Sequence, residues 1–226
     1  VHCTERAAGL LMAMKEHHIT VPRTARYHTL GDARTAKSVW FVLHGYGQLA
    51  RYFLRAFEGL EKDLLIVAPE GLSRYYTDAG HTRVGATWMT REDREREIVD
   101  HVAYLDLLAD RIKQECPQAK HGQVLGFSQG VATAARWSMN GRTALQRLVL
   151  WGGGLPAELN VDRLRAEWTD KHVDLVAGLT DAIVTEEQGR QQDALLSAAG
   201  VPHAFHIHPG RHALDPLILS RLLVIG

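Results

Sequence analysis

The stretch Gly126-Phe127-Ser128-Gln129-Gly130 places one serine between two glycines, after an apolar run and before an alanine-rich segment. A serine in a sharp turn between a strand and a helix exposes its hydroxyl at a helix N-terminus, where free N–H groups favour negative charge. The glycines are needed because a Cβ at either position would clash with neighbouring backbone. The pattern predicts that Ser128 is a nucleophile. The alternative is a serine in an ordinary glycine-flanked turn.

A serine nucleophile needs a general base, and the base needs an acid to orient it. Among the 13 histidines, His212 lies in a loop between the last apolar run and the last helical segment, so we expect it to be the base. His203, His206 and His208 lie within or beside that last run, and we expect them to pack or to face solvent. A structural loop histidine is the alternative for His212.

The predicted acid is Asp181, which ends the apolar run 173–181 and begins the loop "AIVT". Asp174 lies at the wrong end of the same run. Asp215 follows the histidine and is better explained as the N-cap of the last helix, with Pro216 in the first helical position. An N-cap role is also the alternative for Asp181.

The segment "LHGYGQ" (43–48) follows an apolar run and carries two glycines that let the backbone turn. We expect the backbone N–H of Tyr46 to face a substrate there, and the N–H of Gln129, directly after the serine, to be a second donor. Two such donors stabilise the oxyanion of an acyl-transfer transition state. His44 is expected to brace this loop, and the glycines of "WGGG" (151–154) are expected to allow close packing. A plain glycine turn is the alternative for "HGYGQ".

Elements that position these residues follow from the hydrophobic pattern. Nearly continuous apolar runs, as found where both faces of a parallel sheet are covered, predict strands; they lie at 38–45, 64–71, 122–128, 147–153, 173–181 and 203–210. The segments "EHHITVP" (16–22) and "ARYHTLG" (25–31) alternate more and predict an antiparallel edge pair. Helices are expected at 50–62, 91–116, 185–200 and 215–226, and directly after Ser128. Thr90 with Asp93 is expected to cap the second of these.

This alternation of strands and helices predicts an α/β fold with a doubly wound, mostly parallel sheet of about seven or eight strands flanked by helices. We expect one domain over 1–226 without a large cap domain. In such sheets ligands bind at the carboxyl ends of the strands, where Ser128, Asp181 and His212 are predicted to lie.

Together these motifs resemble the α/β-hydrolase superfamily, and within it the phospholipase/carboxylesterase group that includes acyl-protein thioesterases. The resemblance covers nearly the whole chain, and "GFSQG" is its most specific part. It implies the nucleophile, acid and base named above, with Tyr46 and Gln129 at the oxyanion hole. Two features depart from the pattern: no proline follows the acid closely, and Arg211 rather than glycine precedes His212.

The aromatic stretch 73–93 is too long for a simple turn, and we expect it to lie over the site. Tyr75, Tyr76, Trp88 and Met89 are the candidates for an acyl-binding wall. A satellite patch of the core is an equal alternative.

The predicted activity is cleavage of carboxylic esters through an acyl-enzyme on Ser128, with a small-molecule ester as the partner. An acyl-thioesterase, lysophospholipase or peptidase with the same triad is the enzymatic alternative, and a non-catalytic binding module is the alternative of another class. No HExxH motif or P-loop lysine is present, so we expect no metal and no cofactor. The oligomeric state stays open.

With 26 basic and 26 acidic residues, the formal net charge is zero, which argues against nucleic acid or an anionic membrane as a partner. No stretch reaches the length of a transmembrane helix, so no stable membrane insertion is expected.

The segment "AAGLLMAM" near the start predicts an amphipathic helix rather than a signal peptide. Cys3 and Cys116 have no metal or redox spacing, and a cytoplasmic location is expected. Because the chain begins with Val1, a removed leader stays open.

Overall fold

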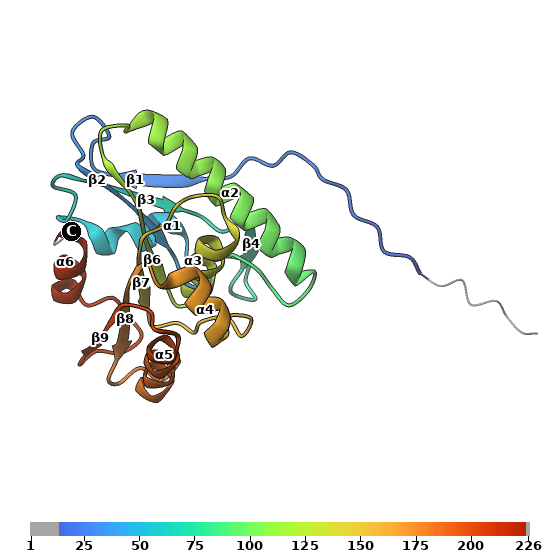
Figure 1. The fold of residues 1–226 in the computed structure, drawn as a ribbon. Coiled ribbons are helices and arrows are strands. Elements are labelled where there is room, and N and C mark those ends of the chain that lie inside the picture. Colours follow the sequence, from blue (N-terminus) through green and yellow to red (C-terminus); the bar gives the residue numbers. More distant parts are fainter. Residues whose placement is uncertain (1–13, 225–226) are drawn as a thin grey trace, which may run out of the picture.

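The structure, a computed structural model, describes residues 14–224 (Figure 1). The strands in this range are β1 (Tyr27–Leu30), β2 (Ser38–Leu43), β3 (Leu64–Pro69), β4 (Ser73–Tyr76), β5 (Val84–Thr87), β6 (Lys120–Phe127), β7 (Arg147–Trp151), β8 (His172–Gly178) and β9 (His203–His208). The helices are α1 (Ala50–Phe53), α2 (Arg94–Glu115), α3 (Gln129–Asn140), α4 (Val161–Trp168), α5 (Glu186–Ala199) and α6 (Pro216–Val224), with a 3₁₀ turn η1 (Leu54–Phe57) directly after α1.

Seven of the strands form one sheet in the order β1-β3-β2-β6-β7-β8-β9. All neighbours in it are parallel except β1, which runs antiparallel to β3 at the edge. The register pairs Phe127 with Trp151 and Trp151 with Val176, so β6 and β7 end level with one another and β8 continues a little further, to Gly178. The chain therefore has the expected doubly wound α/β fold, and the segments after these three strands meet at one edge.

Helices cover both faces of the sheet (Figure 1). Apolar residues of α2, α3, α4 and α5 pack with one face into the larger buried cluster. Residues of α1, η1 and α6 pack with the other face into a second cluster. Burial on both faces explains why β3 is an uninterrupted apolar run, since each of its six residues is buried.

The six predicted runs all form strands, but each continues past its strand at the carboxyl end. The run 173–181, for example, leaves the sheet at Gly178, where β8 ends. The residues beyond each strand form the loops at the carboxyl ends of the strands, and their apolar or glycine-rich composition is similar to that of a strand. The predicted helix 185–200 is confirmed, with a capping box of Thr185 and Gln188 at its start and Gly200 (φ 72°) at its end.

Two predictions near the start of the chain are wrong. Residues 16–22 form no strand; they are exposed and irregular, and the edge of the sheet is β1 alone. The predicted helix 50–62 is only the short α1 followed by η1, because the chain turns before Gly59 (φ 86°). The amphipathic helix predicted around 7–14 falls almost wholly outside the described residues.

The region before α2 also differs from the prediction. The stretch 73–93 is not an irregular loop, since β4 and β5 pair in it as an antiparallel hairpin. The cap predicted from Thr90 and Asp93 does not form: Asp93 is the N-cap with φ 48° and makes no side-chain cap bond, and Thr90 binds the Glu97 carboxylate instead. The helix α4 was not predicted, because only Leu164 and Trp168 of it are buried.

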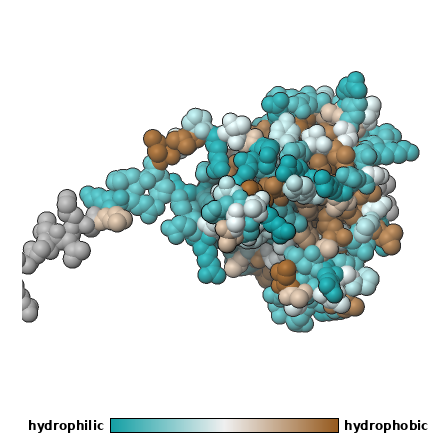
Figure 2. All heavy atoms as spheres, turned by 180° about the vertical axis from the view of Figure 1, so that it is seen from behind, coloured by the Kyte–Doolittle hydropathy of each residue, from teal (hydrophilic) through white to brown (hydrophobic). Residues whose placement is uncertain are grey.

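The surface seen in Figure 2 mixes hydrophilic and hydrophobic residues, with the apolar patches scattered. None of the helices in the described range is long and apolar enough to cross a bilayer. Cys116 is buried with a free thiol that donates to the Ala33 carbonyl. Cys3, its possible partner, falls outside the described residues.

Candidate active site

Ser128 occupies a strained turn between the central strand β6 and α3. Its φ is 54° and its ψ −117°, a conformation that L-residues rarely adopt, and its N–H donates to the Trp151 carbonyl at 2.9 Å. A Cβ on Gly126 would lie 2.3 Å from the Gly130 carbonyl oxygen, and one on Gly130 would lie 2.2 Å from the Leu43 oxygen. Both glycines are thus required by close backbone approach, as the sequence predicted. The half-buried serine ends up at the N-terminus of α3.

Asp181 and His212 form a hydrogen-bonded pair in the loops after β8 and β9. His212 Nδ1 lies 2.7 Å from Asp181 Oδ2, while Asp181 Oδ1 accepts the N–H groups of Ile183 (2.8 Å) and Val184 (3.0 Å). Burial acts to raise the pKa of the Asp181 carboxyl, but the hydrogen bonds from His212, Val184 and Ile183 outweigh it and hold that pKa below its ordinary value. The carboxylate is therefore charged at neutral pH, and it orients the imidazole with Nδ1 protonated and Nε2 free to accept.

The pair lies beside the turn that carries Ser128. The His212 ring packs on the Phe127 ring with a centroid distance of 4.9 Å. A Cβ on Gly152 would lie 3.5 Å from His212 and 3.6 Å from Asp181, and one on Gly153 would meet the Ser128 carbonyl oxygen. Gly153 thus allows the close packing that was predicted for "WGGG", whereas a Cβ on Gly154 would meet no heavy atom within 4 Å. Within the described residues, the Ser128 hydroxyl makes no hydrogen bond.

The rejected alternatives have structural partners of their own. Asp215 caps α6, since its Oδ1 accepts the N–H groups of Leu217 and Ile218, each at 3.0 Å. Asp174 is buried at the start of β8 and binds His206 Nε2 at 2.8 Å.

The histidines of β9 also have structural contacts. His203 binds Asp193 at 3.0 Å, and the buried His208 packs on the Trp151 ring. Neither contact involves the Ser128 turn.

The loop after β2 is held by polar contacts on both sides. His44 Nε2 accepts the Gly71 N–H at 3.0 Å, so the proton is on Nδ1, which donates to the Gly45 carbonyl at 2.8 Å. Burial lowers the pKa of this imidazole and keeps it neutral. The Gly45 N–H donates to Gln48 Oε1 at 2.8 Å. His44 therefore braces the loop, as predicted. Among the described residues, no hydrogen-bond partner is present for the Tyr46 N–H.

Sequence reasoning missed what the β4–β5 hairpin does for this loop. Gly47 N–H donates to the Ala86 carbonyl at 2.9 Å, and Ala86 N–H donates to the Gln48 carbonyl at 3.2 Å. A Cβ on Gly85 would lie 2.5 Å from the Gly47 oxygen. The strand β5 is therefore packed directly on the loop that carries Tyr46. The only signal in the sequence was the glycine in the short segment "VGAT".

The four residues expected to form an acyl-binding wall lie in different environments. Tyr75 lies against the Tyr46 loop, with ring centroids 5.3 Å apart, and a Cβ on Gly47 would lie 3.1 Å from its buried hydroxyl. Tyr76 is 57% exposed and packs on His81. Trp88 is only 1% exposed and donates through Nε1 to the His44 carbonyl, so it is part of the core and cannot form an open wall. Met89 packs against the same core.

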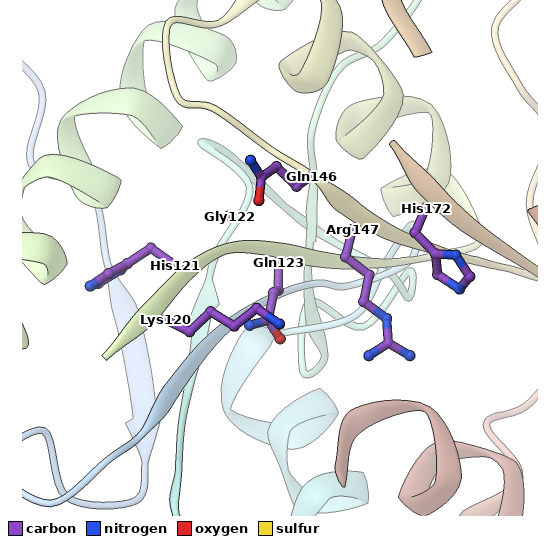
Figure 3. Close-up of a pocket in the computed structure, with 7 residues that line it drawn as sticks. All are labelled: Lys120, His121, Gly122, Gln123, Gln146, Arg147 and His172. Carbon is purple, nitrogen blue, oxygen red and sulfur yellow. The ribbon is translucent and has the colours of Figure 1, made fainter. Parts of the chain in front are cut away.

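A hollow of about 330 Å³ opens at the opposite edge of the sheet (Figure 3). It is lined by the first residues of β6, β7 and β8 and their neighbours, namely Lys120, His121, Gly122, Gln123, Gln146, Arg147 and His172. Ser128 follows the other end of β6, so this hollow is separate from the candidate active site.

One group of side chains in the described range has ligand atoms close enough to hold a metal ion: Glu16, His18 and Asp93. All three are exposed, and His18 Nε2 already lies 3.0 Å from Glu16 and 3.2 Å from Asp93. The contacts are explained as polar contacts between surface side chains, and none of the three belongs to the Ser128 site.

No family model matches the chain, and no curated protein sequence matches it. Solved structures do. A carboxylesterase from Mesorhizobium loti superposes with a TM-score of 0.68 at 17% identity, over 88% of this chain and 94% of that one. Acyl-protein thioesterase 2 of Zea mays superposes with a TM-score of 0.68 at 21% identity, over 89% of this chain and 99% of that one. A carboxylesterase from Bacillus cereus superposes with a TM-score of 0.64 at 19% identity, over 87% of this chain and 91% of that one. The chain therefore has the α/β-hydrolase fold, in the form found in small carboxylesterases and acyl-protein thioesterases.

Proposed function

We propose that the chain is a serine hydrolase that cleaves carboxylic esters through an acyl-enzyme. His212 Nε2 takes the proton of Ser128 as its Oγ bonds to the ester carbonyl carbon. The tetrahedral intermediate collapses, the C–O bond to the alcohol breaks, and His212 gives its proton to the departing oxygen. Water, deprotonated by the same imidazole, then bonds to the acyl carbonyl carbon. The bond between that carbon and Oγ breaks, His212 returns the proton to Oγ, and the carboxylic acid leaves.

The observation that carries this proposal is the 2.7 Å contact between Asp181 and His212, beside a serine with φ 54°. This contact fixes the tautomer that a general base requires. The hydrogen bond from Ser128 to His212 is expected to form with substrate bound, since catalytic hydrogen bonds are often long before substrate binds.

Two backbone donors support the oxyanion role. Gln129 is the first residue of α3, where helix N–H groups lack intrahelical partners, and the Tyr46 N–H belongs to a loop fixed by β5. Donors held in place before the reaction stabilise the developing negative charge without the cost of reorganisation; each is worth about 3–4 kcal/mol in measured cases.

The substrate class is inferred from the fold and from one aromatic side chain beside the oxyanion loop. Esterases and a thioesterase share the fold, and Tyr75 offers an aromatic ring beside the oxyanion loop. We propose a small ester whose acyl or alcohol group contacts Tyr75. A comparison of p-nitrophenyl esters of increasing chain length with acyl-thioesters, a lysophospholipid and peptide amides separates the alternatives.

The direct test of function is Ser128→Ala with p-nitrophenyl acetate. We expect kcat/KM to fall by about 10⁴-fold or more, with an unchanged circular dichroism spectrum. Ser197→Ala, at an exposed position of α5, is the matched control and is expected to retain full activity. If Ser128→Ala hydrolyses the ester at the wild-type rate, Ser128 is not the nucleophile. If the wild-type protein itself is inactive, the alternative of a binding module is favoured.

A further inference from the structure

The side chain of Gln129 is fully engaged away from the substrate side of the turn. Its Oε1 accepts the Trp88 N–H at 3.2 Å, and its Nε2 donates to the Met89 carbonyl at 2.9 Å and to the Thr87 hydroxyl oxygen at 2.9 Å. The Trp88 N–H only donates and the Met89 carbonyl only accepts, so the amide has one possible orientation. The backbone N–H of the same residue is the proposed oxyanion donor.

The segment that receives this amide also holds the other donor. Residues 86–89, here called the strap, bind the Tyr46 loop through Ala86, which exchanges hydrogen bonds with Gly47 and Gln48. The same strap donates from Trp88 Nε1 to the His44 carbonyl at 2.9 Å. One short segment is thus bonded to Gln129 and to residues on both sides of Tyr46, the two residues whose N–H groups would form the oxyanion hole.

The strap itself is rigid, because it is buried. Residues 86–88 are each at most 2% exposed, and the Trp88 ring stacks on His44 with a centroid distance of 5.0 Å. A Cβ on Gly71 would lie 2.4 Å from the Thr87 carbonyl oxygen, so the chain passes close behind it. Buried, fully paired amides have few alternative arrangements.

We infer that the Gln129 side chain is a positioning group: by bonding to the strap it sets the spacing between its own N–H and that of Tyr46. The inference rests on the proposed function. Loss of the amide contacts leaves the backbone free to turn at the start of α3, and the two donors no longer converge on one oxygen. Such misplacement weakens binding of the tetrahedral intermediate and leaves binding of the planar ester nearly unchanged.

The test is steady-state hydrolysis of p-nitrophenyl acetate by Gln129→Met, which keeps the length of the side chain and removes its hydrogen bonds. We expect kcat to fall by about 10–100-fold with KM within about twofold, and the inhibition constant of butylboronic acid, a mimic of the tetrahedral intermediate, to rise in parallel. A merely structural role would lower the melting temperature and the active fraction without changing the ratio of boronate to substrate affinity.

Two further variants make the test independent of one folding outcome. Thr87→Val removes a partner of the amide from the strap, and its effect on kcat combined with Gln129→Met should be smaller than the product of the single effects. Gln129→Glu keeps the acceptor for Trp88 but places an oxygen against the Met89 carbonyl, and is expected to lower kcat similarly. Gln191→Met, on the exposed face of α5, is the matched control.

The outcomes separate this inference from the proposed function. A wild-type protein without turnover overturns both. Wild-type turnover together with an unchanged kcat in folded Gln129→Met or Gln129→Glu overturns the positioning role alone, as does full additivity of Thr87→Val and Gln129→Met.

Discussion

At the scale of single residues, the arrangement of Asp181 leads to a specific prediction. Its Oδ1 is occupied by the N–H groups of Ile183 and Val184, so an asparagine would place its carbonyl oxygen there. The NH₂ group would then face His212 Nδ1 and force the proton onto Nε2, the wrong tautomer for a base. We expect Asp181→Asn to lower kcat by about 10⁴-fold with little change in KM or stability.

Asp215→Asn is the matched control for that variant. Asp215 makes the same pair of contacts to backbone N–H groups, but it caps α6, and asparagine is an equally good N-cap. We expect its activity and melting temperature to equal those of the wild type. Equal activity of Asp181→Asn and Asp215→Asn in the same assay would contradict the assignment of the acid.

The sharp turn that carries Ser128 was predictable from the sequence because its environment is local. Ser128 is flanked by glycines and lies between an apolar run and an alanine-rich segment, and both features are visible within residues 123–136. The buried position of Trp88 and the side-chain contacts of Gln129 were not predictable. The aromatic stretch predicts a substrate wall that includes Trp88, but the burial of Trp88 depends on contacts with His44, 44 residues away. Contacts over such separations have no local pattern.

At the scale of elements, the approach of α3 to β2 depends on Gly130. A Cβ there would lie 2.2 Å from the Leu43 oxygen and 3.0 Å from the His44 oxygen, which are backbone atoms and cannot swing aside. Gly130→Ala should therefore push the helix outward, lower the free energy of unfolding by about 1–3 kcal/mol and reduce esterase activity. Urea titration measures the first effect and p-nitrophenyl acetate turnover the second.

The control is Gly154→Ala, because a Cβ there has no heavy atom within 4 Å. We expect its free energy of unfolding to stay within about 0.5 kcal/mol of the wild type. If Gly130→Ala is as stable as this control, the helix does not depend on the close approach.

Elements were predictable in proportion to their burial. The strands of the large sheet were found because burial on both faces produces continuous apolar runs. The β4–β5 hairpin was missed because "SRYY" and "VGAT" are short and partly polar, and because β5 is stabilised by a loop that precedes it by some 40 residues. The helix α4 was missed because two buried side chains form too weak a pattern.

At the scale of the whole molecule, buried neutral histidines couple stability to pH. Burial is the main cause that lowers the pKa of His101 to about 4, from an ordinary value of 6.5. As the pH falls, His101 is therefore protonated in the unfolded chain before it is protonated in the folded protein. The stabilisation is fully present above pH 6.5 and is lost as the pH falls toward about 4, which amounts to about 3 kcal/mol for this group alone.

We predict that His101→Leu flattens the decline in the free energy of unfolding between pH 6.5 and pH 4, as measured by urea titration at several pH values. The variant need not match the wild type in absolute stability, because the prediction concerns only how the free energy of unfolding changes with pH. His81→Gln, at an exposed position, should leave the slope unchanged. An unchanged slope in His101→Leu would show that this histidine is not neutral in the folded protein.

The central claim, that Ser128 is an activated nucleophile, is tested most directly by mapping the site of reaction with a fluorophosphonate probe by mass spectrometry of peptides. The account predicts one adduct per chain, on Ser128, and a much slower reaction in Asp181→Asn. An adduct on another residue, or none on folded wild-type protein, would contradict it.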